Sequence, residues 1–209
     1  MAALTRDQVI ERLEGEADFV EEDLSFTDLS GLDLSGRDFS HATLTRANFT
    51  GANLAGADLS EAYMVEVEAN GADFSRATMH RTFLQRAFVE GARFHDADLS
   101  GAQFMICRCR GADFTGARMR GAVLLDSILD EVDLTRADCT RANFRGATME
   151  RARLDGTVLT GADLRKVKFL DATFTDVSDE GVLFYGKKPW GGKAADVDYG
   201  RILPYFQDD

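Results

Sequence analysis

The chain is poor in the residues that build disulfide frameworks, and it has no long hydrophobic run at its start. Its 209 residues include only three cysteines, Cys107, Cys109 and Cys139. An odd number of cysteines without a disulfide framework indicates a reducing compartment, so we expect a cytoplasmic protein. No apolar run of roughly 7–15 residues follows Met1, and neither a secretory signal nor a membrane span is predicted.

Basic residues are also in deficit. The sequence has 24 Lys and Arg against 36 Asp and Glu, for a net charge of −12. This balance argues against ordinary binding to a nucleic-acid backbone. The acidity is concentrated toward the N-terminus, because residues 1–60 carry 12 acids and 4 bases whereas residues 61–120 carry 8 of each.

A five-residue rhythm runs from Ala17 to Phe174 without an insertion. Every fifth position from Phe19 to Phe174 is apolar, which gives 32 positions that we call centres. Ala occupies 21 of the 32 positions that lie two residues before a centre. Neither an α-helix nor an ordinary strand has this period, so the chain must turn sharply every five residues.

Glycine and the acidic residues follow the same rhythm. All thirteen glycines of the stretch, from Gly31 to Gly161, lie two residues after a centre, where a tight turn requires a positive φ. Asp or Asn often precedes the centre, as in the blocks 47–49 (Ala-Asn-Phe) and 57–59 (Ala-Asp-Leu), and is expected to hydrogen-bond the turn backbone.

These blocks resemble the pentapeptide-repeat family, whose pattern is A(D/N)LXX, over about three quarters of the chain. The resemblance implies an all-β solenoid, a right-handed quadrilateral parallel β-helix in which four pentapeptides, about 20 residues, form one square coil. Residues 17–176 then make about eight coils. At roughly 4.8 Å per coil the rod is about 38 Å long without its ends.

The two ends of the chain differ from this stretch. Residues 1–16 are predicted to form a capping helix, with Thr5 and Gln8 in a capping box and Leu4 and Val9 in a hydrophobic staple. Glu22 and Arg37 replace the inward Ala of the first coil, which requires a splayed or wet end. Residues 177–209 are expected to form a C-terminal cap or a dimerisation tail. Their apolar residues include Val182, Phe184, Trp190, Tyr199, Ile202, Leu203, Tyr205 and Phe206.

No residue pattern indicates catalysis, a cofactor or a metal. Cys107 and Cys109 take the two inward positions of one pentapeptide, which favours buried small hydrophobic residues over a redox or metal site. His41, His80 and His95 project outward on separate coils and do not converge. A packed square coil offers no cleft in which two carboxylates could act as acid and base. We therefore expect no enzyme activity.

Outward positions should be polar, and on one side of the rod they are not. Nine apolar residues occupy outward positions in the third to sixth coils, and a contiguous apolar patch usually marks a partner surface. They are Tyr63, Val65, Phe83, Phe88, Met105, Ile106, Val123, Leu125 and Ile128. Three occupants are considered: the chain's own N-terminal segment or C-terminal tail, a second copy, and a different protein.

Two functions follow. The first is a protein-protein interaction module, similar to accessory or effector components of bacterial secretion systems that place a short helix before such repeats. The second comes from the Qnr-type branch of the family, whose members imitate duplex DNA and bind DNA gyrase and topoisomerase IV, giving quinolone resistance. The acidic balance favours the mimic, while a group of arginines in the middle coils opposes it. These are Arg76, Arg81, Arg86, Arg93, Arg108, Arg110, Arg118 and Arg120.

Overall fold

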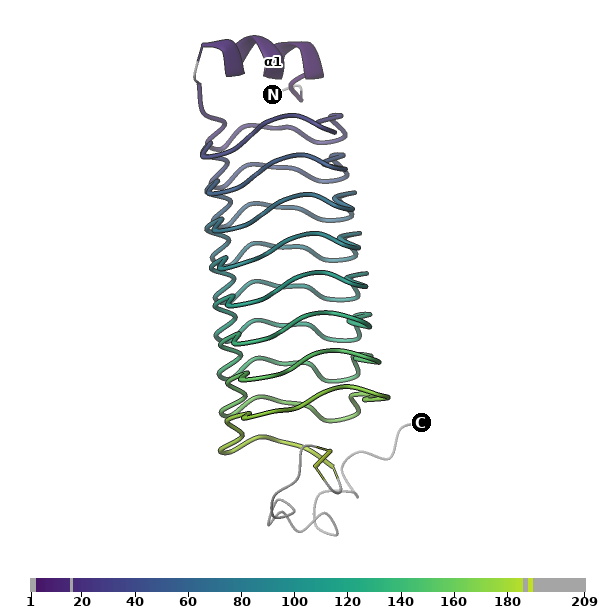
Figure 1. Ribbon diagram of the computed structural model, residues 1–209. Helices are drawn as coiled ribbons and strands as arrows, with labels where there is room; N and C mark the ends of the chain where they lie inside the picture. The colour runs from purple at the N-terminus through teal and green to yellow at the C-terminus, as the bar shows by residue number, and fades with distance from the viewer. Residues whose placement is uncertain (1–2, 16, 186–187, 190–209) are drawn as a thin grey trace.

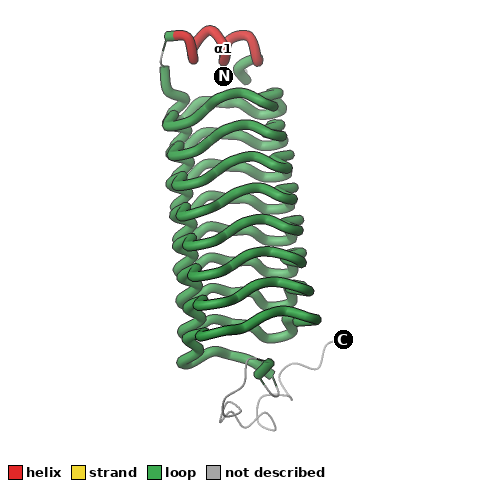
Figure 2. Tube along the Cα trace, in the orientation of Figure 1, coloured by secondary structure: helices red, strands yellow, loops and turns green. Residues whose placement is uncertain are grey.

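The chain forms a rod of stacked coils with a helix across its N-terminal end (Figure 1). The computed structural model describes residues 3–15, 17–185 and 188–189. Within these residues the helix is α1 (Arg6–Glu14), and the coils that follow consist of turns and isolated bridges (Figure 2). Most of the predicted C-terminal segment, including Trp190 and all residues after it, lies outside the described residues.

Each coil is 20 residues long, because every β-bridge joins a residue to the one 20 positions later in parallel orientation. The bridges form four ladders, which we name after their first members: the Asp23, Asp28, Asp33 and Asp38 ladders. The Asp38 ladder ends at Ser178 and the Asp23 ladder at Leu183, so coil geometry continues past residue 176.

The ladders are made of single-residue bridges rather than longer strands in the described part of the chain. Because every pentapeptide contains a turn, only one of its residues forms β-bridges, and this residue pairs with the coil before it and with the coil after it. Thr43 is typical: its carbonyl accepts from the Leu24 amide at 2.8 Å, and its own amide donates to the Glu22 carbonyl at 2.9 Å. The five-residue period is therefore satisfied by backbone pairing without extended strands.

The turn conformation belongs to the repeat and not to glycine alone. All thirteen predicted turn glycines have positive φ, for example 65° at Gly111. The same position has a φ of 59° at Arg136 and 53° at Arg81. A side chain in this left-handed region costs roughly 1 kcal/mol. Packing of the coils must therefore offset that cost wherever glycine is absent.

The core is a set of vertical side-chain columns inside the coils. Phe74, Phe94 and Phe114 are fully buried centres 20 residues apart, and they stack with ring centroids 5.0 and 4.8 Å apart. The inward Ala residues from Ala42 to Ala162 are buried beside the centres. Burial of each large side chain contributes roughly 1.5–3 kcal/mol before the entropy of ordering is subtracted.

Some inward positions hold hydroxyl groups in place of Ala. Thr82, Ser127 and Thr157 are buried, and each hydroxyl donates to the carbonyl 23 residues earlier in the chain. Buried polar groups are tolerated when such a bond satisfies them. The sequence pattern alone did not reveal this arrangement.

Helix α1 closes the N-terminal end of the rod. Its cap has the predicted box, with Gln8 N–H donating to the Thr5 hydroxyl, and Val9 is fully buried. Arg6 donates to the carbonyl of Ser30 at 3.0 Å. Arg12 pairs with Glu22 at 2.6 Å, so the charge at this inward position is compensated by the helix. The first coil's exposed edge is thereby covered.

Candidate functional site: an apolar edge

The nine apolar residues singled out from the sequence all reach the outer surface. Tyr63, Ile106 and Ile128 have 50%, 51% and 37% of their surface exposed. The remaining six are partly exposed: Val65, Phe83, Phe88, Met105, Val123 and Leu125. The side chains of α1 hydrogen-bond Glu22, Asp28 and Ser30 in the first coil, two coils before the first of these apolar residues.

These residues do not lie on one flat side. Tyr63, Phe83 and Val123 belong to the Asp23 ladder, whereas Phe88 and Ile128 belong to the Asp28 ladder. The other four occupy the two-residue turn between those ladders: Val65, Met105, Ile106 and Leu125. The expected single side is therefore corrected to an edge where two adjacent sides meet. We call the nine residues the apolar edge.

Two aromatic contacts order the apolar edge. Tyr63 and Phe83 are bridge partners, and their rings stack with centroids 5.0 Å apart and planes 5° from parallel. The Arg108 guanidinium carbon lies 5.3 Å from the centroid of the Phe88 ring. Stacked pairs of this kind contribute roughly 0.5–1.5 kcal/mol beyond area burial. The surface is thus preformed rather than composed of freely rotating side chains.

The apolar edge occupies positions where other turns carry a structural hydrogen bond. On the Asp33 and Asp38 ladders, Asp73, Asp98 and Asp113 each accept from the amide two residues later, at 2.9, 3.1 and 2.8 Å. On the Asp23 and Asp28 ladders none of the eight bridge residues between 63 and 128 accepts such a bond. The amide of Glu90, two residues after Phe88, instead donates to the side-chain oxygen of Asn70 in the preceding coil at 2.9 Å.

Charged residues border the apolar edge in alternation. Glu66 lies between Arg46, at 2.7 Å, and Arg86, at 3.7 Å. The hydrogen bond and charge of Arg46, followed by the charge of Arg86, lower the pKa of the Glu66 carboxyl. These three residues, with Glu68 and Phe88, line a surface groove of about 340 Å³.

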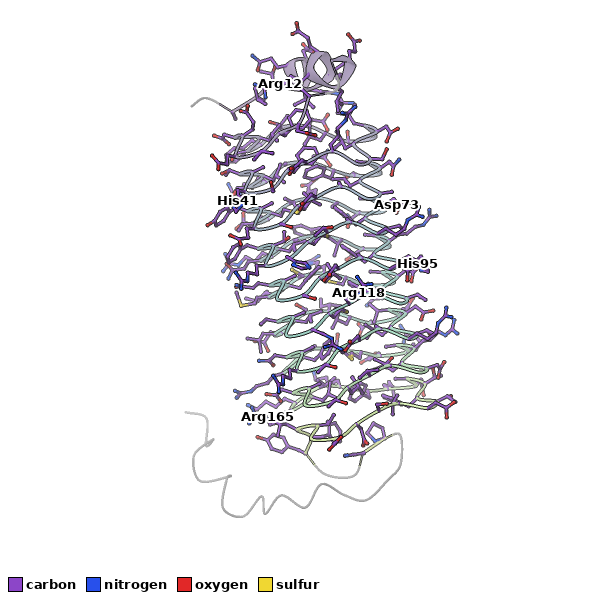
Figure 3. The ribbon with its side chains drawn as sticks, turned by 90° about the vertical axis from the view of Figure 1, so that its left-hand side faces the viewer. Arg12, His41, Asp73, His95, Arg118 and Arg165 are labelled. Atoms are coloured by element: carbon purple, nitrogen blue, oxygen red, sulfur yellow. The ribbon has the colours of Figure 1, made fainter. Side chains whose placement is uncertain are left out.

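Groups that might support chemistry are separate or buried. Burial raises the pKa of the Cys107 thiol to about 12, and burial also raises the pKa of the Cys109 and Cys139 thiols. None of the three therefore forms a thiolate near neutral pH. His41 pairs with Glu61 at 3.7 Å and lies on the opposite flank of the rod from His95 (Figure 3). Among the described residues, no group of three His, Cys, Asp or Glu could hold a metal ion.

Most arginines of the middle coils are engaged with carboxylates. Arg93 lies 3.7 Å from Asp73, and Arg118 lies 3.8 Å from Asp98. Such exposed pairs contribute little to stability, roughly 0–1 kcal/mol. They do neutralise the acidic ladders, as the sequence predicted for these coils.

The described part of the chain contains no helix with the length and apolar character needed to cross a membrane.

Four parallel ladders, a turn in every pentapeptide and a continuous apolar interior define a repeat solenoid. The chain belongs to the pentapeptide repeat family: the family model "Pentapeptide repeats" matches in eight copies over residues 15–46, 43–81, 72–105, 107–138 and 137–176. Members of this family form right-handed β-helical solenoids and are generally structural or interaction modules rather than enzymes.

Solved structures of the family are similar to this chain at low sequence identity. Full-length QnrB1, a plasmid-mediated fluoroquinolone resistance protein, is 18% identical, with 90% of this chain and 91% of that chain covered and a TM-score of 0.51. HetL, a protein involved in heterocyst differentiation regulation from the cyanobacterium Nostoc sp. strain PCC 7120, is 22% identical, with 87% and 97% covered and a TM-score of 0.40. The search of curated proteins found no match.

Proposed function

We propose that this chain is a non-enzymatic protein-protein interaction module that binds a partner protein on the apolar edge. The rod behind the edge is a right-handed, four-sided β-helix of about eight coils. The observation that carries the proposal is the outward placement of nine apolar residues along one edge, five of them at bridge positions where Asp73 and Asp113 on another ladder accept a structural hydrogen bond. A set of apolar residues that replaces stabilising groups on a surface indicates selection for binding.

Covering of the apolar edge by the N-terminal segment is not supported. Helix α1 lies across the end of the rod, and its bonds reach Glu22, Asp28 and Ser30 in the first coil (Figure 1). The apolar edge starts at Tyr63, two coils further along.

The three free cysteines fit the reducing cytoplasm in which we propose that the module acts, as an accessory or effector scaffold of a bacterial cell.

The test replaces the two phenylalanines of the apolar edge. Phe83→Ser with Phe88→Ser should abolish partner binding, because aromatic residues near the centre of an interface tend to be hot spots. Each change should reduce stability by only about 1 kcal/mol, since both rings are partly exposed. The matched control is Phe94→Ser, which removes a fully buried, stacked ring and should cost roughly 3–5 kcal/mol.

Binding is measured with a photo-crosslinking amino acid at position 105 in living cells, compared with the same group at position 153 on the Asp33 ladder. We expect a specific adduct at position 105 that the double serine variant loses. If the double variant is destabilised as much as Phe94→Ser and position 105 gives no adduct, the chain itself covers the apolar edge and the proposal is wrong.

A second candidate is a DNA-mimicking binder of DNA gyrase or topoisomerase IV. The specific observation in its favour is that all four bridge positions of the first coil are acidic: Asp23, Asp28, Asp33 and Asp38. The paired arginines of the middle coils oppose it. A supercoiling assay with gyrase, with and without a quinolone, tests this function: protection of the enzyme by the purified chain would favour it, and no effect at micromolar concentrations would exclude it.

A further inference from the structure

We propose that the partner on the apolar edge is a second copy of this chain, bound antiparallel, with the two-fold axis crossing the edge at Ile106. This inference rests on the proposed function and names its occupant. An interface between identical copies must be self-complementary, so that each residue on one side of the axis faces its counterpart on the other. The apolar edge meets this requirement about one position.

The turn residues that project from the edge give the first argument. In successive coils this position holds Glu66, Arg86, Ile106, Asp126 and Gly146. An antiparallel two-fold at Ile106 reverses their order in the second copy. Ile106 then faces itself, while Arg86 faces Asp126 on both sides of the axis. The arrangement pairs opposite charges twice around an apolar centre, and each step along the rod is roughly 4.8 Å.

The neighbouring positions agree with the same axis. On the Asp28 ladder, Phe88 faces Ile128, and on the Asp23 ladder Phe83 faces Val123. Met105, next to Ile106, faces itself. The same alignment also sets Leu125 against Gln85 and Gln103 against itself, and both of these contacts are uncharged.

The side chains of the charged pair point in compatible directions. Arg86 reaches back toward the preceding coil, where its Nη1 lies 3.7 Å from Glu66 Oε1. Asp126 reaches forward over the next coil, because its carboxylate occupies the space where a Cβ on Gly146 would lie. Both groups therefore lean away from Ile106, one in each direction. The two-fold brings the leaning guanidinium of one copy to the leaning carboxylate of the other.

Two like-charge pairs would form about this axis. Arg108 would face itself, but its guanidinium is drawn 5.3 Å from the Phe88 ring, toward the preceding coil and off the axis. Arg46 and Lys166 face each other three coils away, and Arg46 already pairs with its own Glu66 at 2.7 Å.

Nearby axes are less favourable. An axis one coil toward the N-terminus places Arg86 against itself, and one coil toward the C-terminus places Asp126 against itself. A shift of half a coil toward the N-terminus opposes Glu66 to Asp126. A shift of half a coil toward the C-terminus opposes Ile106 to Asp126. Of these positions, only the axis at Ile106 pairs opposite charges and sets no like charges against each other within two coils of the axis in the turn column.

Charge exchange provides the test on the full-length chain. Arg86→Asp and Asp126→Arg are made separately, and oligomeric state is measured by sedimentation velocity from 1 to 100 µM. The wild type should be a dimer, and each variant alone should dissociate with at least a ten-fold higher Kd, because like charges then meet twice. An equimolar mixture of the two variants should recover wild-type affinity as a heterodimer, since both contacts are again opposite in sign.

A cysteine pair checks the geometry. Ile106→Cys should form an intermolecular disulfide under mild oxidation, whereas Arg153→Cys on the Asp33 ladder should not, and the three native cysteines are buried. A wild type that stays monomeric at 100 µM, or a dimer that survives both single changes, would overturn the second-copy proposal. In that case a position-105 adduct with a different protein would still support the interaction module, whereas no adduct at all would remove both.

Discussion

The Asp33 and Asp38 ladders and the apolar edge are built on the same backbone but use their outward residues differently. On the ladders, Asp73 and Asp113 bind the turn amide that follows, and such a bond contributes about 1 kcal/mol. On the apolar edge, Tyr63 and Val123 occupy the equivalent positions and make no such bond. The backbone bridges of the Asp23 ladder continue through these coils although the side-chain-to-amide bond is missing. The fold therefore does not require an acceptor at these positions, and their side chains can serve binding instead.

The largest effect is expected from breaking the alignment of both regions at once. One residue inserted after Gly111 should shift every later centre, including Phe114, to an outward position and unfold the C-terminal coils. Hydrogen exchange should then show fast-exchanging amides beyond the insertion.

Duplication of residues 92–111 is the matched control, because it adds one whole 20-residue coil and preserves each ladder. The duplicated chain should melt no lower than the wild type. An insertion variant with wild-type thermal stability would show that the repeat does not set the fold.

The repeat itself was predictable from sequence because a single period dictates core, turns and pairing together. Phe94 and its neighbours in the column follow from counting 20 residues, and Thr5 with Gln8 follows from local helix chemistry. The edge between two sides was not predictable, because the period does not say which outward positions flank the same turn. The Arg12–Glu22 pair was not predictable for a related reason. Arg12 lies in a helix and Glu22 in a coil, and the five-residue period does not relate positions in the one to positions in the other.

The second expected effect concerns the end that is capped by a helix rather than by another coil. Deletion of residues 1–16 should remove the buried Val9 and leave Glu22 without Arg12. The exposed first coil should then promote chain-to-chain pairing, measured as concentration-dependent aggregation by light scattering.

Arg12→Ala is a smaller change at the same end and should lower the free energy of unfolding by about 1 kcal/mol. Adding Glu22→Ala in the same chain should restore most of that stability. A truncated chain that remains as soluble as the wild type at high concentration would show that α1 does not protect the end.

A smaller effect distinguishes the acidic first coil from the apolar edge by pH. The hydrogen bond from Ser30 lowers the pKa of Asp28, and that from Ser35 lowers the pKa of Asp33, relative to the usual value of 3.8. A carboxyl with a lowered pKa in the folded state stabilises the fold above its unfolded pKa, and this stability is lost as pH falls through the folded pKa.

Asp28→Asn with Asp33→Asn keeps an oxygen acceptor for each amide but removes the titration. The melting temperature of this variant should lie below that of the wild type at pH 7, because the stability contributed by the two ionised carboxyls is lost, and it should fall less between pH 5 and pH 2. An equal fall in both proteins would show that these two carboxyls do not contribute to acid unfolding.

The smallest effect tests the comparison directly by exchanging residues between the two regions. Phe83→Asn places an acceptor opposite the amide of Gln85, which makes no hydrogen bond in the structure, while it loses the stack on Tyr63. The two terms are each about 1 kcal/mol, so stability should change by less than about 1 kcal/mol. Phe83→Ala is the matched control, because it loses the ring and gains no bond, and it should be less stable than Phe83→Asn by about 1 kcal/mol in a denaturant melt.

The reverse exchange, Asp113→Phe, removes the 2.8 Å bond from the Thr115 amide and should cost a similar amount. Equal stability of the Asn and Ala variants would mean that the turn of the apolar edge cannot accept the bond, and the absence of Asp there would then reflect backbone geometry rather than use of the position for binding.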